Sequence, residues 1–261
     1  MRLHIALARA LNRLGAFIQS CAVMVVSSDD LVELSRQTYA KPASIDRYNR
    51  DDLVAGGLTS KEQQLLEHIP SRTGRLLLLG VGGGREAIPF AQMGFDVTGV
   101  DFIPAMVERA IANAARHNAP IQGIVQDIAV LDVPAEAYDV VWLSTLMYSC
   151  LPTRARRVQL LQRVRRALKP GGCFACQFYW DTPWQSPRKG EFLRRMIAWL
   201  TWGNRSYERG DMLSGNKFIH AFSSESDLRA DFAAAGFHVA WLNIPTDGRI
   251  YGEALLQKRE A

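Results

Sequence analysis

A run of four leucines, Leu76 to Leu79, leads directly into a turn that contains Gly80, Gly82, Gly83 and Gly84. An apolar run without a polar break is typical of a strand that is buried on both faces of a parallel sheet. Glycines after such a strand let the backbone turn sharply and approach a ligand closely, because no side chain occupies that space. The feature predicts an α/β fold with a ligand site at the carboxyl end of this strand.

The glycine spacing excludes two common nucleotide sites. A dinucleotide fingerprint that starts at Gly80 requires a glycine where Arg85 stands, and a P-loop requires a lysine that the turn lacks. A second apolar run ends at Asp101, where a carboxylate can accept hydrogen bonds from both hydroxyls of a ribose. The pattern G-x-G-x-G followed by this acid therefore indicates a site for a nucleoside-containing cofactor.

The pattern resembles motif I of the class I S-adenosylmethionine-dependent methyltransferases, and other features of that family follow in order over residues 74–180. They are an acid after the third strand (Asp127), an aromatic-Asp opening of the fourth (Tyr138-Asp139) and a Lys-Pro-Gly-Gly turn (169–172) before the fifth. The chain departs from the family at Leu78, where an acidic residue is usual. This departure concerns an indirect polar contact near the methionine end of the cofactor.

The resemblance implies a Rossmann-like seven-stranded sheet with an antiparallel last strand and helices on both faces. We expect the methyltransferase domain over residues 74–261, with an acceptor-side insertion at about 180–222, where aromatic residues interrupt the alternation of strands and helices. Residues 1–73 are expected to form an N-terminal helical extension that acts as a lid. The dipeptide Asp247-Gly248 predicts a tight hairpin between the last two strands.

The resemblance also implies S-adenosyl-L-methionine as the cofactor. The glycine turn is expected to approach its methionine carboxylate and ribose, Asp101 the ribose hydroxyls, and Asp127 the adenine amino group. Tyr39 and Tyr48 are candidates to close the methionine end, with ordinary packing as an equal alternative. The predicted cofactor-binding residues are Gly80, Val81, Gly82, Gly84, Asp101, Phe102, Met106, Asp127, Ile128, Leu143 and Tyr39.

The acceptor side carries fewer signals. The fourth strand ends without the Asn/Asp-Pro-Pro-Tyr signature of amide and base methylation, and the chain has no Pro-Cys dipeptide of the kind that marks a DNA cytosine nucleophile. Both absences favour methylation of oxygen, nitrogen or carbon in a small molecule. The aromatic residues between Trp180 and Phe222 favour an acceptor with a hydrophobic or aromatic part. Tyr148 and His220 are the candidates for catalytic proton handling or acceptor orientation, with packing as the alternative.

Two other functions remain open from the sequence. A predicted helix carries a basic stripe, which is typical of phosphate-binding surfaces and makes an RNA methyltransferase one alternative. The stripe consists of Arg154, Arg156, Arg157, Arg163, Arg165, Arg166 and Lys169. Helices beside such sheets also carry solvated Arg and Lys, so a nucleic-acid partner is not favoured. A catalytically silent protein that binds the cofactor or a partner is the other alternative.

The N-terminal segment has apolar residues at helical spacing, with Arg2, Arg9 and Arg13 on the opposite face. We expect this helix to pack on the domain or on a second subunit in a homodimer, with peripheral contact to a membrane surface as the alternative. The arginines interrupt any signal-peptide core and no apolar stretch is long enough for a membrane span, so a cytoplasmic protein is expected.

The four cysteines form no obvious disulfide framework. Cys173 and Cys176 lie three residues apart in a predicted strand, so their side chains are expected on opposite faces as buried thiols. No group of His, Cys or Asp residues has the spacing of metal ligands, so no metal is predicted.

Overall fold

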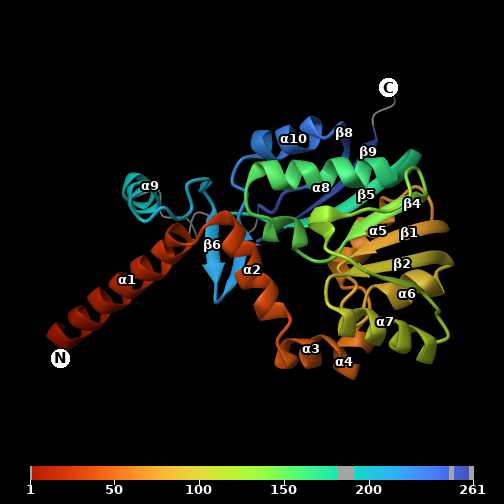
Figure 1. Ribbon diagram of the computed structural model, residues 1–261, viewed down its shortest axis with the longest axis horizontal. Helices are drawn as coiled ribbons and strands as arrows, with labels where there is room; N and C mark the ends of the chain where they lie inside the picture. The colour runs from red at the N-terminus through yellow and green to blue at the C-terminus, as the bar shows by residue number, and fades with distance from the viewer. Residues whose placement is uncertain (1, 182–190, 247–249, 259–261) are drawn as a thin grey trace.

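Seven strands form one mixed sheet in the order β3-β2-β1-β4-β5-β9-β8 in the computed structural model, which describes residues 2–181, 191–246 and 250–258 (Figure 1). The strands are β1 (Gly74–Leu79), β2 (Phe95–Asp101), β3 (Gln122–Val125), β4 (Tyr138–Leu143), β5 (Leu168–Tyr179), β8 (Phe237–Asn243) and β9 (Tyr251–Lys258). β9 is antiparallel to β5 and to β8, which confirms the predicted sheet with an antiparallel last strand. The predicted turn at Asp247-Gly248 lies outside the described residues.

Helices cover both faces, so the sheet is the middle of three layers (Figure 1). One face carries α5 (Ser60–Glu67), α6 (Ala87–Gln92) and α7 (Pro104–Arg116); the other carries α8 (Arg154–Ala167), α10 (Glu225–Ala234) and the short 3-10 helices η1 (Ile128–Val130) and η2 (Met147–Cys150).

The two cores explain the four leucines of β1. Leu77 and Leu79 belong to the core under α8, whereas Leu76 and Leu78 belong to the core under α5 to α7, and all four are fully buried. In β5, Cys173 and Cys176 likewise face opposite cores, as the sequence predicts. Burial raises the pKa of the Cys173 thiol to about 12, so it is a protonated packing group near neutral pH.

The segment before β1 is helical, with α1 (Arg2–Val25), α2 (Ser28–Tyr39), α3 (Pro42–Tyr48) and α4 (Asp51–Ala55) ahead of α5. Ser27 caps α2 by accepting a hydrogen bond from the Asp30 backbone N–H. α5 begins with a capping box between Thr59 and Glu62.

Figure 1 shows α1 extending away from the sheet. Val23 and Met24 at its C-terminal end are buried, but Leu7, Leu11 and Leu14 are exposed. The expectation that this apolar stripe packs on the domain is therefore wrong for the first turns, and packing on a second subunit stays a prediction. Within the described ranges, no helix combines the length and hydropathy needed to cross a bilayer.

The expected insertion after β5 contains α9 (Glu191–Leu200) and a small antiparallel hairpin, β6 (Asp211–Ser214) and β7 (Lys217–His220). Trp184 and Pro187 of this stretch lie outside the described residues. Met24 of α1, Leu31 of α2 and Phe218 of β7 share one apolar cluster. The N-terminal extension and the insertion therefore pack together at one end of the molecule.

Candidate active site

The glycine turn and Asp101 lie together at the carboxyl ends of β1 and β2. The backbone N–H groups of Gly80 and Val81 donate to the Val100 carbonyl, at 2.7 and 2.9 Å. One Asp101 carboxylate oxygen accepts from the Gly82 N–H and the other from the Ile103 N–H, each at 3.1 Å. Burial raises the pKa of Asp101 above its ordinary value, although these hydrogen bonds favour the charged form.

Three glycines of the turn have different neighbours. A Cβ placed on Gly82, whose φ is +50°, would meet no atom within 4 Å. A Cβ on Gly83 would lie 2.3 Å from the Tyr48 carbonyl oxygen, and one on Gly84 would lie 3.3 Å from the Ala110 carbonyl oxygen. Gly82 therefore faces open space, whereas Gly83 and Gly84 let α3 and α7 pack closely. The sequence analysis did not single out Gly83.

Asn49 places an unsatisfied polar atom beside this turn. Its side-chain N–H group donates to the Ile45 carbonyl at 2.8 Å, but no described residue donates to its buried Oδ1. A buried acceptor without a donor costs free energy unless a ligand or water satisfies it. A Cβ on Gly83 would lie 3.0 Å from this oxygen, which places the oxygen next to the turn. Nothing in the sequence distinguishes Asn49 from an ordinary loop asparagine.

Arg36 of α2 contacts both Phe102 and Asp127, two of the predicted cofactor-binding residues. Its guanidinium carbon lies 5.2 Å from the centre of the Phe102 ring, and its Nη1 lies 3.3 Å from Asp127 Oδ2. The other oxygen of Asp127 accepts from the Ala129 N–H at 2.9 Å. The structure thus brings Phe102 and Asp127 to one side of the site. The sequence analysis missed Arg36 because a lone arginine on an amphipathic helix usually faces solvent.

The N-terminal extension contacts the glycine turn, and its role as a lid stays a prediction. The rings of Tyr39 and Tyr48 are 6.3 Å apart, and the Tyr48 backbone contacts the glycine turn. Tyr39 instead meets the insertion, since Lys217 Nζ lies 4.1 Å from the centre of its ring. Burial raises the pKa of Tyr39 well above its usual range, so its hydroxyl stays protonated.

The four apolar candidates support the site from below. Val81, Met106, Ile128 and Leu143 are buried, with exposures of 3, 2, 8 and 1%. Val81 packs so closely on Gly99 that a Cβ at that position would lie 2.5 Å from Val81 Cγ2. Val81 belongs to the core under α5 to α7, and Ile128 and Leu143 belong to the core under α8.

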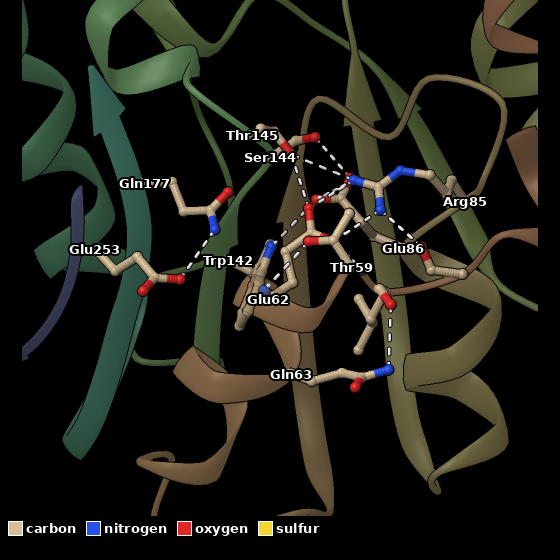
Figure 2. A network of polar contacts seen from close by, with 12 residues as sticks. Thr59, Glu62, Gln63, Arg85, Glu86, Trp142, Ser144, Thr145, Gln177 and Glu253 are labelled. Atoms are coloured by element: carbon tan, nitrogen blue, oxygen red, sulfur yellow. Dashed lines mark hydrogen bonds and ion pairs between the residues drawn. The ribbon is translucent and has the colours of Figure 1, made fainter. Parts of the chain in front are cut away.

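A polar network that the sequence analysis did not predict lies beside the turn (Figure 2). Arg85 donates two hydrogen bonds to the Glu62 carboxylate at 2.7 and 2.6 Å, and Thr145 donates to the same carboxylate at 2.7 Å. Ser144 Oγ donates to Glu86 Oε2 at 2.6 Å. Burial opposes the charge on Glu62, but Arg85 outweighs it and lowers the pKa of Glu62 to about 2. Burial raises the pKa of Glu86 to about 7.

The network also bears on the departure at Leu78. Leu78 is paired in register with Trp142 across β1 and β4, and the Trp142 indole N–H points to Glu86 Oε1 at 3.4 Å. A buried carboxyl group therefore lies close to the strand position that lacks the family's usual acid. The sequence does not single out Glu86, because an acidic residue just after a glycine turn is common in the first turn of a helix.

Tyr148 and His220, the predicted catalytic pair, lie in packed surroundings. The Tyr148 ring is fully buried and stacks on Phe222 with 5.5 Å between ring centres. His220 Nδ1 lies 2.7 Å from Asp211 Oδ1, and its ring packs edge-on against Phe222. No described contact joins either side chain to the glycine turn or to Asp101. Their role in proton handling stays a prediction, and their positions favour the packing alternative.

The basic stripe of α8 is bound to other parts of the chain. Arg157 contacts Asp231 at 3.0 Å and Glu208 at 2.6 Å, and Arg154 contacts Asp231 at 2.6 Å. The remaining members contact Asp29, the Leu131 carbonyl, the Gly236 carbonyl, Asp132 and Asp139. These cations already have carboxylate or carbonyl partners, which argues against a phosphate-binding role.

Comparison with known proteins agrees with this arrangement. Residues 76–172 match a family described as a methyltransferase domain. An uncharacterized methyltransferase of Synechocystis is 32% identical over 47% of this chain and 56% of its own length. A ubiquinone biosynthesis O-methyltransferase of Methylobacterium nodulans is 30% identical over 70% of this chain and 66% of its own length. The chain thus spans between about half and two thirds of these relatives.

A solved structure, magnesium protoporphyrin IX methyltransferase of Synechocystis with bound S-adenosylhomocysteine, has the same fold. Its TM-score is 0.57 at 17% identity, and the alignment covers 88% of this chain and all of that one. Fold and site define a Rossmann-like protein with a nucleoside-cofactor turn. Residues 76–172 are a methyltransferase domain, the fold is that of the class I S-adenosylmethionine-dependent methyltransferases, and the prediction of S-adenosyl-L-methionine as the cofactor is confirmed.

Proposed function

We propose that this chain transfers the methyl group of S-adenosyl-L-methionine to a small-molecule acceptor with a hydrophobic or aromatic part. The observation that carries the proposal is the open space above Gly82, with the Asp101 carboxylate beside it at the end of β2. When bound, the cofactor supplies a methyl group on a sulfonium, so the leaving group is neutral.

The residues of the site fit this cofactor. Asp101 is positioned to accept the ribose hydroxyls, and Phe102 and Asp127 flank the adenine side beneath Arg36. The unsatisfied Asn49 oxygen offers a further acceptor next to the glycine turn. Glu86 holds the hydroxyl of Ser144 at the end of β4 and so fixes that part of the wall. These groups bind and orient the donor, which is the main task of such an enzyme.

Two observations support a small-molecule acceptor. The cations of the α8 stripe have intramolecular partners, which counts against RNA. Two of the similar proteins are named for ubiquinone biosynthesis and for magnesium protoporphyrin IX, both small molecules with apolar parts. The aromatic residues Tyr39 and Tyr48 supply an apolar wall on the lid side.

The experiment is an incubation of the purified protein with methyl-labelled cofactor and fractionated extract of the source cells. We expect label in the organic-extractable small-molecule fraction, and binding of S-adenosylhomocysteine by calorimetry. Label in RNA or in protein would show that the acceptor is a macromolecule and not a small molecule. Cofactor binding without transfer to any fraction would favour the catalytically silent alternative.

A further inference from the structure

The first turns of α1 carry an uncovered apolar face. Leu7, Leu11, Leu14 and Ile18 follow one another at spacings of four, three and four residues, so they lie on one side of the helix. Their exposed fractions are 57, 59, 54 and 61%, and Arg9 lies on the opposite side. No described part of the chain covers this stripe, and an exposed apolar patch of this kind marks a surface that contacts another molecule or a membrane.

α9 carries a second apolar face. Phe192, Met196 and Trp199 share one side of the helix at spacings of four and three residues, and Phe192 and Trp199 are 82 and 67% exposed. Trp202, just after the helix, is 76% exposed. The opposite side of α9 holds Ala198, which is buried. Large aromatic side chains on the exposed face are uncommon on a monomeric soluble surface.

The two faces belong to one structural unit. The C-terminal end of α1 packs on α9 through Val23, Met24 and Ala198 in a shared apolar cluster. Arg194 of α9 also donates to Ser20 Oγ of α1 at 3.4 Å. Figure 1 shows both helices at the end of the molecule that lies away from the sheet. We call this unit the α1–α9 surface.

The charge of the α1–α9 surface is positive. Residues 1–28 contain Arg2, Arg9 and Arg13 and no acidic residue. A hollow of about 230 Å³ beside α9 is lined by Arg195 and Arg205, with Trp199 and Tyr207 among the other lining residues. Aromatic and aliphatic groups with interspersed arginines match the interface of a bilayer that contains acidic phospholipids.

We propose that the α1–α9 surface docks the protein on a bilayer containing anionic phospholipids, with the apolar faces inserted at the headgroup boundary. The inference does not depend on methyl transfer. A second copy of this chain fits the surface less well, because α1 holds three arginines and no acid, and α9 adds two arginines and only one acid, Glu191. A two-fold axis would therefore bring like charges together. The bilayer supplies both the apolar region and the negative charge.

The test is flotation of the full chain with phosphatidylcholine vesicles, with and without about 30% phosphatidylglycerol. We expect at least about tenfold stronger partitioning to the anionic vesicles, weakened by salt. Leu11→Asn with Leu14→Asn, and separately Phe192→Ser with Trp199→Ser, are each expected to lower partitioning about tenfold or more. Arg9→Glu is expected to lower it several-fold.

Matched controls lie far from this surface. Met93→Gln replaces an exposed apolar residue after α6, and Arg72→Glu reverses an exposed charge before β1. Both are expected to bind vesicles like the wild type, and thermal unfolding checks that every variant is folded. Equal partitioning to both kinds of vesicle, or none to either, would overturn the proposal. A dimer that the same variants dissociate, without vesicle binding, would identify a second copy as the occupant.

Discussion

Arg36 Nη1 lies 3.3 Å from Asp127 Oδ2, so an ion pair joins the second helix of the chain to the loop after β3. The same guanidinium lies over Phe102. Arg36 therefore covers the adenine side of the proposed site. Asp127, which holds Arg36 in place, is itself predicted to contact the cofactor.

Replacing Arg36 with Ala tests this cover. The pair is partly exposed, and such pairs contribute about 0.2–1 kcal/mol, so we expect the dissociation constant for S-adenosylhomocysteine to rise about two- to fivefold. Calorimetry at low and high salt is the measurement, and the difference from the wild type is expected to shrink with salt. The control is Arg166→Ala, which breaks the exposed ion pair between Arg166 of α8 and Asp132. Unchanged affinity at low salt would contradict the role of Arg36.

Asp101→Ala removes the predicted ribose acceptor. Loss of a charge-assisted hydrogen-bond acceptor is expected to weaken cofactor binding by one or two tenfold steps. Asp96→Ala removes an exposed acid of the same strand and is expected to leave affinity unchanged. If the two variants bind the cofactor equally well in calorimetry, the assignment of Asp101 fails.

The neighbouring glycines give a paired test. Ala at position 83 would place a Cβ 2.3 Å from the Tyr48 carbonyl, so Gly83→Ala is expected to lower the melting temperature and loosen α3. Gly82→Ala meets open space at φ +50° and is expected to cost about 1 kcal/mol of stability. If the cofactor occupies this space, Gly82→Ala is also expected to weaken cofactor binding by about tenfold, which is the larger of its two effects. Thermal unfolding and calorimetry separate the two outcomes.

Glu86 predicts a pH dependence of stability. Its pKa is raised by burial from 4.5 to about 7, so the native state binds the proton more tightly than the unfolded chain. Its contribution to stability is fully present below pH 4.5 and is lost as the pH rises through 7. Glu86→Gln has no such loss, so its stability relative to the wild type is expected to rise by up to about 3 kcal/mol between pH 5 and pH 8.5.

Urea unfolding at both pH values measures this difference. Glu108→Gln, an exposed acid of α7, serves as the control and is expected to track the wild type. A constant offset between Glu86→Gln and the wild type at the two pH values would show that Glu86 is ionised throughout.

Tyr148→Phe and His220→Asn separate packing from catalysis. Their buried positions predict a lower melting temperature for His220→Asn, because Asp211 would lose its hydrogen-bond partner. Initial rates of methyl transfer per folded molecule are expected to stay within about threefold of the wild type. A drop of about a hundredfold or more in either variant with unchanged stability would restore the catalytic assignment.

The sheet was predictable because its signals are local. Leu76 to Leu79 and the glycine turn mark β1, and Asp101 ends β2, so motif order gave the topology and the donor side of the site. Contacts that depend on how distant segments pack were not predictable. Glu62 contacts Arg85, and the Tyr48 carbonyl contacts Gly83. Both contacts join residues that are far apart in the sequence, so no local pattern predicts them.

The buried position of Tyr148 likewise depends on local geometry that the sequence does not record. A tyrosine just after the fourth strand suggested a position at the acceptor, but the chain turns at Leu146, whose φ is +62°. The following 3-10 helix directs Tyr148 into the core against Phe222. A backbone reversal at a non-glycine residue gives no sequence signal.

The bidentate pair between Glu62 and Arg85 has a consequence for how this molecule can be divided. A fragment that begins at β1 would retain Arg85 without the Glu62 carboxylate that pairs with its guanidinium, and its glycine turn would lose the backbone of α3. Such a fragment would contain every recognised motif of the family and still lack a complete donor site. We therefore expect the smallest unit that holds the cofactor to be longer than residues 76–172, the stretch that matches the family.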